Sequence, residues 1–121
     1  MPSRARLDEF IAAVVSGDHV GAIERYYTDD ASMQENAAPP RVGRDTLVAH
    51  ERAALARVSS VTSTCVASIV EGDRVAINWV FVFTDHAGKT TRFDEIALQE
   101  WRGDRIGRER FFYDPATLKS W

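Results

Sequence analysis

The chain has 121 residues, of which 45% are hydrophobic and 27% charged, and its formal net charge is -3. This length and balance predict one globular domain spanning residues 1–121, and the interleaved, mildly acidic charge argues against a nucleic-acid or membrane surface. Cys65 is the only cysteine, which excludes an internal disulfide and a thiolate metal cluster. Because the N-terminus has no secretory pattern and no segment reaches the roughly 18 apolar residues of a membrane span, we expect a cytoplasmic protein.

Two helices are predicted at the start of the chain. The first has apolar residues at the i, i+3, i+4, i+7, i+8 spacing of an amphipathic helix, followed by Gly17; they are Leu7, Phe10, Ile11, Val14 and Val15. Asp18 can cap a second, shorter helix, with Val20, Ile23 and Tyr27 on one face.

A short strand is predicted over residues 31–35. If Ala31 and Met33 point inward, the period of two also points Glu35 inward. A carboxyl group in an apolar interior needs a reason, and proton transfer at a binding site is one. The alternative is a rim residue that forms an ion pair with Arg41 or Arg44.

A third helix is predicted after Gly43, and its apolar stripe carries two polar residues, His50 and Glu51. The rest of the stripe consists of Leu47, Ala54, Leu55 and Val58. His50 is a candidate for relaying a proton or binding a ligand, and the alternative is a hydrogen-bonded core or rim residue. No pair of histidines has metal-ligand spacing, so we expect no metal and no cofactor.

From Val61 onward the hydrophobic period changes to two. Four antiparallel strands are predicted, joined by turns that contain glycine or aspartate; they span residues 61–70, 75–84, 90–101 and 106–113, and a tail follows at 115–121. Helices first and strands second predict an α+β domain.

The second of these strands is apolar on both faces. One face carries Ile77, Trp79, Phe81 and Phe83, and the other carries Val80 and Val82. Either the chain itself covers both faces, or the outer face of the sheet is buried in a homodimer, which we expect here.

The order of elements resembles the nuclear-transport-factor-2-like, or cystatin-like, superfamily, and within it the SnoaL-like, polyketide cyclase-like group. The resemblance covers essentially the whole chain. Its most specific pieces are Tyr27-Thr-Asp-Asp-Ala-Ser, Pro39-Pro40 to Gly43-Arg44-Asp45, and Glu109-Arg-Phe-Phe-Tyr-Asp-Pro115. It implies three N-terminal helices packed in the concave face of a curved, mostly antiparallel sheet, a cone with a pocket at its open end.

The resemblance does not carry over the catalytic sets of two well-known branches. Glu35 falls on the base position of the ketosteroid isomerases, but their two oxyanion donors fall at Phe10 and about Ala97. The catalytic Arg and Asp residues of limonene epoxide hydrolase fall on aromatic residues, namely Trp79, Phe81 and Phe111.

The pocket positions of these relatives translate to an aromatic cavity with few polar groups. The implied ligand-binding residues are Met33, Ala54, Trp79, Phe81, Phe93, Ala97 and Phe111, and the catalytic candidates are Glu35, Glu95, His50 and Tyr113. A two-residue loop at Gly103-Asp104 would place Glu95 opposite Phe112, whereas a three-residue loop would place it opposite Tyr113; the resemblance favours Tyr113.

We therefore predict a protein that binds a small apolar molecule. The predicted activity is isomerisation, cyclisation or dehydration of a small apolar carbonyl compound by carboxylate acid–base chemistry. The alternative is a non-catalytic binding or dimerisation module of the same fold.

Overall fold

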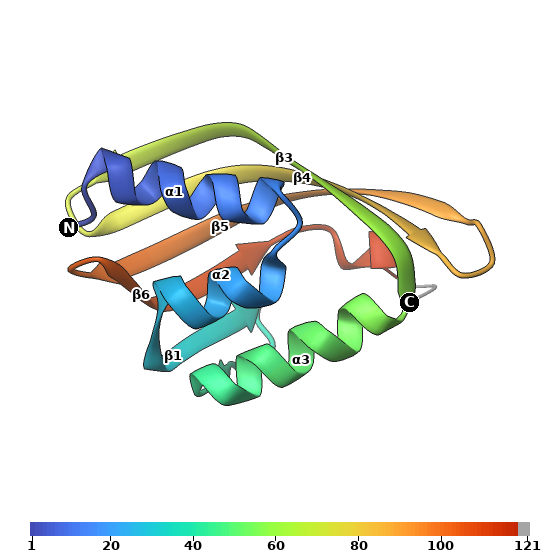
Figure 1. Ribbon diagram of the computed structural model, residues 1–121, viewed down its shortest axis with the longest axis horizontal. Coiled ribbons are helices and arrows are strands. Elements are labelled where there is room, and N and C mark those ends of the chain that lie inside the picture. The colour runs from blue at the N-terminus through green and yellow to red at the C-terminus, as the bar shows by residue number, and fades with distance from the viewer. Residues whose placement is uncertain (119–121) are drawn as a thin grey trace.

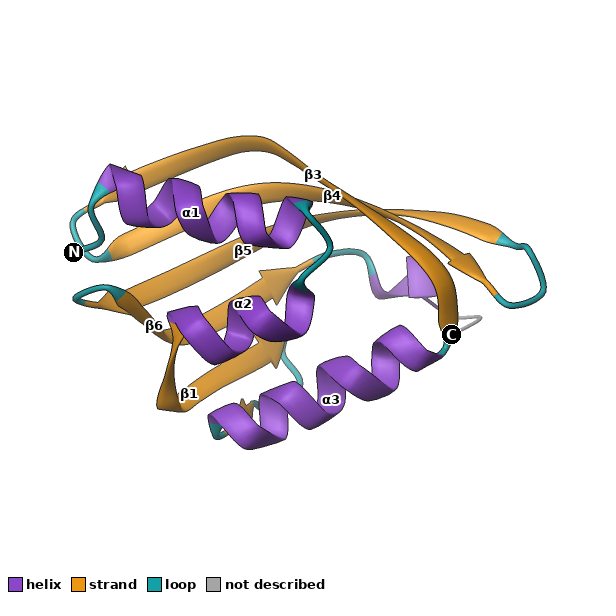
Figure 2. Ribbon diagram, in the orientation of Figure 1, coloured by secondary structure: helices purple, strands orange, loops and turns teal. Residues whose placement is uncertain are grey.

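Three helices lie against one face of a six-stranded sheet in the computed structural model, which describes residues 1–118 (Figures 1 and 2). The helices are α1 (Arg4–Val15), α2 (His19–Tyr26) and α3 (Arg44–Ala56). The strands are β1 (Tyr27–Glu35), β2 (Arg41–Val42), β3 (Val58–Glu71), β4 (Arg74–Asp85), β5 (Thr90–Arg102) and β6 (Arg105–Phe112), followed by a 3-10 turn at Pro115–Leu118.

Both N-terminal helices begin at side-chain caps. Ser3 accepts a hydrogen bond from the backbone N–H of Arg6, and Asp18 accepts one from that of Gly21, each at 3.1 Å. The predicted apolar face of α1 is buried through Leu7, Phe10 and Val14. Capping and periodicity therefore explain both helices from local sequence.

The strand order is β2-β1-β6-β5-β4-β3, and every neighbouring pair is antiparallel except β1 and β6. The predicted α+β fold, with helices in the concave face of a curved and mostly antiparallel sheet, is confirmed. The parallel pair places the end of β1 beside the end of β6, with Glu35 opposite Phe111.

Several predicted boundaries are wrong around the first strand and the third helix. β1 begins at Tyr27 rather than at residue 31, because hydrogen bonding to β6 already starts at the Tyr27–Ile106 pair. Tyr27 therefore belongs to the strand, and Val58, expected on the third helix, begins β3. The two-residue strand β2 was not predicted, since pairing with β1 alone creates it.

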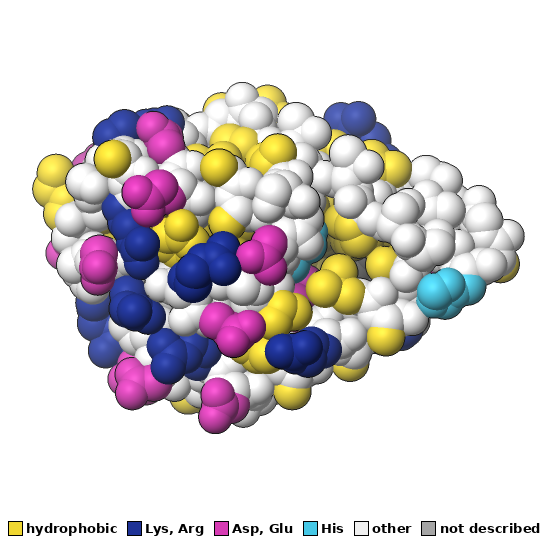
Figure 3. Space-filling model, viewed as in Figure 1, with side chains coloured by type: hydrophobic (Ala, Val, Ile, Leu, Met, Phe, Trp, Pro, Cys, Tyr) yellow, Lys and Arg dark blue, Asp and Glu magenta, His cyan; other side chains and the backbone are white. Residues whose placement is uncertain are grey.

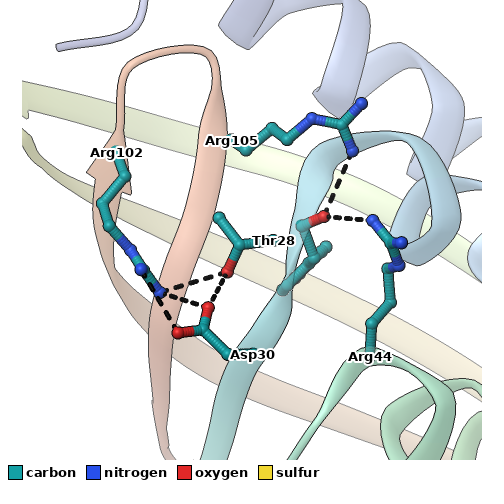
Figure 4. Close-up of polar contacts among 6 residues, drawn as sticks. Thr28, Asp30, Arg44, Arg102 and Arg105 are labelled. Atoms are coloured by element: carbon teal, nitrogen blue, oxygen red, sulfur yellow. Dashed lines mark hydrogen bonds and ion pairs between the residues drawn. The ribbon is translucent and has the colours of Figure 1, made fainter.

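Three arginine side chains hold the start of β1 in place (Figure 4). Arg44 and Arg105 both donate to the backbone carbonyl of Tyr27, at 3.1 and 3.3 Å. Arg102 donates to two side chains of β1, to Thr28 at 3.2 Å and to Asp30 at 2.7 Å. These contacts from α3, β5 and β6 fix the backbone from which the Tyr27 side chain enters the interior.

The face of the sheet opposite the helices remains partly apolar and exposed. Ile96, Leu98 and Phe112 are each about 40% exposed. Val80, expected at a dimer interface, is only 8% exposed within the single chain. Over residues 1–118 no helix combines the length and hydrophobicity needed to cross a membrane. The predicted tail continues past Leu118 into residues 119–121, which lie outside the described part of the chain.

Candidate functional site

A cavity of about 480 Å³ lies between the three helices and the concave face of the sheet. Hydrophobic side chains gather in the hollow between the helices and the protruding end of the sheet (Figure 3). The sheet wall is mainly aromatic, with contributions from Trp79, Phe81, Phe83, Phe93, Phe111 and Tyr113. The volume is within the range of about 300–1,000 Å³ that small-molecule sites occupy.

Ten of the eleven predicted ligand-binding and catalytic residues line this cavity; they are Met33, Glu35, His50, Ala54, Trp79, Phe81, Phe93, Glu95, Phe111 and Tyr113. Ala97 does not line it. Ala97 is fully buried, between Ile77 on β4 and Phe111 on β6. Its short side chain is covered by these larger neighbours, so it belongs to the core under the cavity.

The last hairpin has the two-residue loop of one predicted alternative and the Glu95–Tyr113 pairing of the other. The loop contains two residues, because Arg102 pairs with Arg105. A bulge at Gly107 then adds one residue to β6, so that Ala97 lies opposite Phe111 and Ile96 opposite Phe112. Continuing this register places Glu95 beside Tyr113.

Glu95 is the most unusual polar side chain of the site. It is 7% exposed, lines the cavity and lies directly opposite Trp79 in the β4–β5 ladder. Within residues 1–118 its carboxyl group has no hydrogen bond and no ion pair. Burial, and then the nearby carboxyl groups of Glu109, Glu35 and Glu51, raise its pKa to about 9. At neutral pH Glu95 is therefore a carboxylic acid that can donate a hydrogen bond or a proton.

A second group of polar residues lies at the mouth of the cavity: Glu35, Arg41, His50 and Tyr113, called the mouth cluster below. Arg41 donates to the Glu35 carboxylate at 2.9 Å, and both side chains are about one-third exposed. This is the ion pair predicted as the alternative for Glu35. Glu35 nevertheless lines the cavity, so the pairing and the inward position both occur.

Charge at the mouth affects the other two members of the mouth cluster. Burial, followed by the charge and a hydrogen bond of Glu35, raises the pKa of Tyr113 to about 12. Burial and the neighbouring Arg41 lower the pKa of His50. The mouth cluster thus presents a neutral phenol and a neutral imidazole beside an ion pair.

A third group, not found from the sequence, consists of Tyr27, Gln99, Trp101 and Glu109, called the floor cluster below. Tyr27 and Glu109 line the cavity, and Gln99 and Trp101 are buried behind them. Glu109 is 2% exposed and accepts hydrogen bonds on both oxygens, from the Tyr27 hydroxyl and from the Gln99 amide at 2.6 Å. The indole N–H of Trp101 donates to Gln99 at 3.0 Å. Burial raises the pKa of Glu109 to about 7, although both hydrogen bonds act in the opposite direction.

A signal for the floor cluster was present in the sequence. Gln99 and Glu109 occupy inward positions of β5 and β6 and lie directly opposite each other. Two polar residues facing each other on the apolar side of a hairpin indicate a buried hydrogen bond. The bulge at Gly107 conceals this pairing, because it shifts the register by one residue.

Glu51, predicted only as a polar interruption of the third helix, also faces the cavity. Burial, and then Glu35, raise its pKa. In the described part of the chain its side chain has no hydrogen bond and no ion pair. The cavity thus contains four carboxyl groups, two of them with partners and two without. Among residues 1–118, no three His, Cys, Asp or Glu side chains are grouped closely enough to hold a metal ion.

The comparisons with known proteins agree with this architecture. The SnoaL-like domain model matches residues 7–109. A candidate SnoaL-like polyketide cyclase from Mesorhizobium loti is 25% identical, with a TM-score of 0.78 over 93% of this chain and 100% of that one. A candidate SnoaL-like polyketide cyclase from Jannaschia sp. CCS1 is 11% identical, with a TM-score of 0.83 over 99% and 93%.

A third similar structure is a protein with a ketosteroid isomerase-like fold from Catenulispora acidiphila in complex with trimethylamine. It is 18% identical, with a TM-score of 0.81 over 98% of this chain and 92% of that one. No functionally curated protein matches the sequence. The matched domain covers most of the chain, and the protein therefore belongs to the SnoaL-like domain family, within the NTF2-like fold.

Proposed function

We propose that this protein binds a small apolar carbonyl compound in its aromatic cavity and catalyses proton transfer on it, without a cofactor. The observation that carries the proposal is Glu95, a buried carboxylic acid that faces the cavity and has no hydrogen-bonding or charged partner for its carboxyl group among residues 1–118. Burying a polar group without a hydrogen bond is costly, so such a group is expected where a ligand supplies the missing partner.

A carbonyl oxygen is a suitable partner for a protonated carboxyl group. Because the pKa of Glu95 is raised to about 9, the acid keeps its proton at neutral pH and can donate it to the oxygen. The donation stabilises the negative charge that develops on this oxygen when a neighbouring carbon loses a proton. Isomerisation, cyclisation and dehydration next to a carbonyl all pass through this step.

The aromatic wall is the second element of the proposal. Trp79 and Phe81 are stacked with ring centroids 5.6 Å apart, and Phe93 meets Tyr113 edge to face at 4.7 Å. Flat apolar surfaces of this kind bind the hydrophobic body of a ligand and exclude water from the acid. The mouth cluster gives the other end of the cavity polar groups that can orient the ligand.

The experiment measures exchange of the α-hydrogens of small ketones, such as 1-indanone and cyclohexanone, in D2O by NMR. We expect wild-type protein to accelerate the exchange and Glu95→Gln to lower the rate by about 100-fold, the usual scale for a positioned acid. Glu100→Gln is the matched control, because Glu100 is on the same strand but does not line the cavity. Wild-type protein that binds ketones without exchanging their hydrogens would instead support a non-catalytic binding module.

We also propose that the apolar outer face of the sheet pairs two copies of the chain. The contacts with the partner would be made by Ile96 and Leu98 of β5 and by Phe112 of β6. These are the only large apolar side chains that β5 and β6 leave exposed, and pairing would remove them from water. Light scattering at micromolar concentration tests the proposal, and a monomer would refute it.

A further inference from the structure

The four carboxyl groups of the cavity differ in whether their oxygens are already engaged. Glu35 is neutralised by Arg41 at the mouth, and Glu109 accepts hydrogen bonds on both oxygens at the floor. In the described chain, Glu51 and Glu95 alone among the four have no hydrogen-bonding or charged partner. A proton acceptor needs a lone pair that is not already used by a donor, so this difference bears on the chemistry.

Glu51 and Glu95 lie on different walls of the same cavity. Glu51 projects from the last half of α3, whereas Glu95 projects from the middle of β5. The charge of Glu51 also raises the pKa of Glu95, as expected for two carboxyl groups that line one cavity. A flat molecule resting on the aromatic sheet wall would therefore have Glu95 on one side and Glu51 on the other.

The other two carboxyl groups are poor acceptors for distinct reasons. In Glu35, the guanidinium of Arg41 donates a hydrogen bond at 2.9 Å to one oxygen, so that oxygen is already used by a donor. In Glu109, the Tyr27 hydroxyl and the Gln99 amide occupy the positions from which a substrate proton would approach. Glu51 has neither restriction.

We propose that Glu51 is the proton acceptor that works with Glu95 on the bound carbonyl compound. This inference rests on the proposed function and adds a second catalytic residue to it. The Glu51 carboxylate takes a proton from the carbon next to the carbonyl group, and the electron pair of that C–H bond forms the C=C bond of an enol. The carbonyl oxygen takes the proton of Glu95.

The step leaves Glu51 protonated and Glu95 ionised, so atoms and charge balance without any co-reactant. In D2O the proton on Glu51 is replaced by a solvent deuteron. Delivery of that deuteron to the same carbon gives exchange, and delivery to a different carbon gives an isomer. Glu95 recovers its proton from the enol hydroxyl in either case. Burial and the charge of Glu35 raise the pKa of Glu51, which makes its ionised form a stronger base than an exposed glutamate.

The test compares Glu51→Gln with Glu35→Gln in the ketone exchange experiment. We expect Glu51→Gln to lower the exchange rate of 1-indanone by 100-fold or more, and Glu35→Gln to lower it by less than tenfold. Glu24→Gln is the matched control on the neighbouring helix, since Glu24 is exposed and outside the cavity lining. Its rate should equal that of wild-type protein.

A binding measurement separates loss of chemistry from loss of structure. Isothermal titration with 2,2-dimethyl-1-indanone, which has no α-hydrogen, should give the same affinity within threefold for Glu51→Gln and wild type. Glu51→Gln that keeps full exchange, or a larger loss in Glu35→Gln than in Glu51→Gln, would overturn the inference while leaving the proposed function intact. Absence of exchange in wild-type protein would overturn the proposed function, and the assignment of Glu51 with it.

Discussion

The mouth and the floor of the cavity use the same residue type in opposite ways. At the mouth, Glu35 is paired with a charged partner, Arg41, and both remain about one-third exposed. At the floor, Glu109 is 2% exposed and is held by two neutral donors, Tyr27 and Gln99. Water and a full positive charge stabilise the first carboxylate, whereas only hydrogen bonds stabilise the second.

This difference determines how much each cluster contributes to the stability of the fold. An ion pair between partly exposed side chains contributes little to stability, because water screens it. A buried carboxyl group with two donors is part of the core, since Tyr27 and Gln99 would each be left with an unsatisfied donor without it. We therefore expect the floor cluster to be mainly a structural support for the sheet wall and the mouth cluster to be tolerant of change.

The largest expected effect is on stability, at the floor. Glu109→Leu leaves the Tyr27 hydroxyl and one Gln99 donor without an acceptor in a buried position, and we expect a loss of about 2–5 kcal/mol in unfolding free energy. Urea denaturation followed by circular dichroism measures it. Glu109→Gln keeps one acceptor oxygen and should lose less. A change below about 1 kcal/mol for Glu109→Leu would show that the floor cluster is not structural.

Local sequence predicts some parts of the fold and not others. The helices at 4–15 and 44–56 and the four-strand meander follow from local periodicity, caps and turns, so their existence and order were correct. The early start of β1 at Tyr27 and the strand β2 depend on pairing with distant segments. Local sequence contains no information about such pairing, and these boundaries were therefore missed.

The next largest effect is the pH dependence of stability. In the folded state the pKa of Glu95 is about 9, so its carboxyl group holds its proton up to about that pH, whereas the unfolded chain releases it near the ordinary glutamate pKa of 4.5. The folded state thus binds more protons than the unfolded state between these values, and stability must fall as pH rises. One such group contributes about 1.4 kcal/mol per pH unit, so we expect a loss of roughly 2 kcal/mol between pH 7 and 9.

Glu95→Gln is the control for this prediction, because glutamine does not titrate. Urea denaturation at intervals between pH 7 and 9 should show a flat profile for Glu95→Gln and a falling one for wild type. Glu109 adds little in this interval, since its pKa is raised only to about 7. Identical slopes in both proteins would mean that Glu95 is ionised at neutral pH and is not the acid proposed here.

The site was predicted less completely than the fold, for a physical reason. The period of two predicted that Glu35 faces inward, and the family resemblance implied the same for Glu95. Both side chains line the cavity, but neither signal contains information on partners. Arg41, Gln99 and Tyr27 decide which carboxyl groups are satisfied, and all three reach them across a turn or from another strand. That Glu51 and Glu95 have no partner within the described residues is thus a property of the folded chain alone.

The smallest expected effect is at the mouth. Glu35→Gln removes one charge of an ion pair whose members are about one-third exposed, and we expect a loss of about 0–1 kcal/mol. A double-mutant cycle with Arg41→Gln, measured by urea denaturation, should give a coupling energy of about 0.5 kcal/mol or less. A coupling above roughly 2 kcal/mol would mean that the pair behaves as a buried one. The mouth and the floor would then be stabilised alike, and the tolerance of the mouth cluster to substitution would no longer be expected.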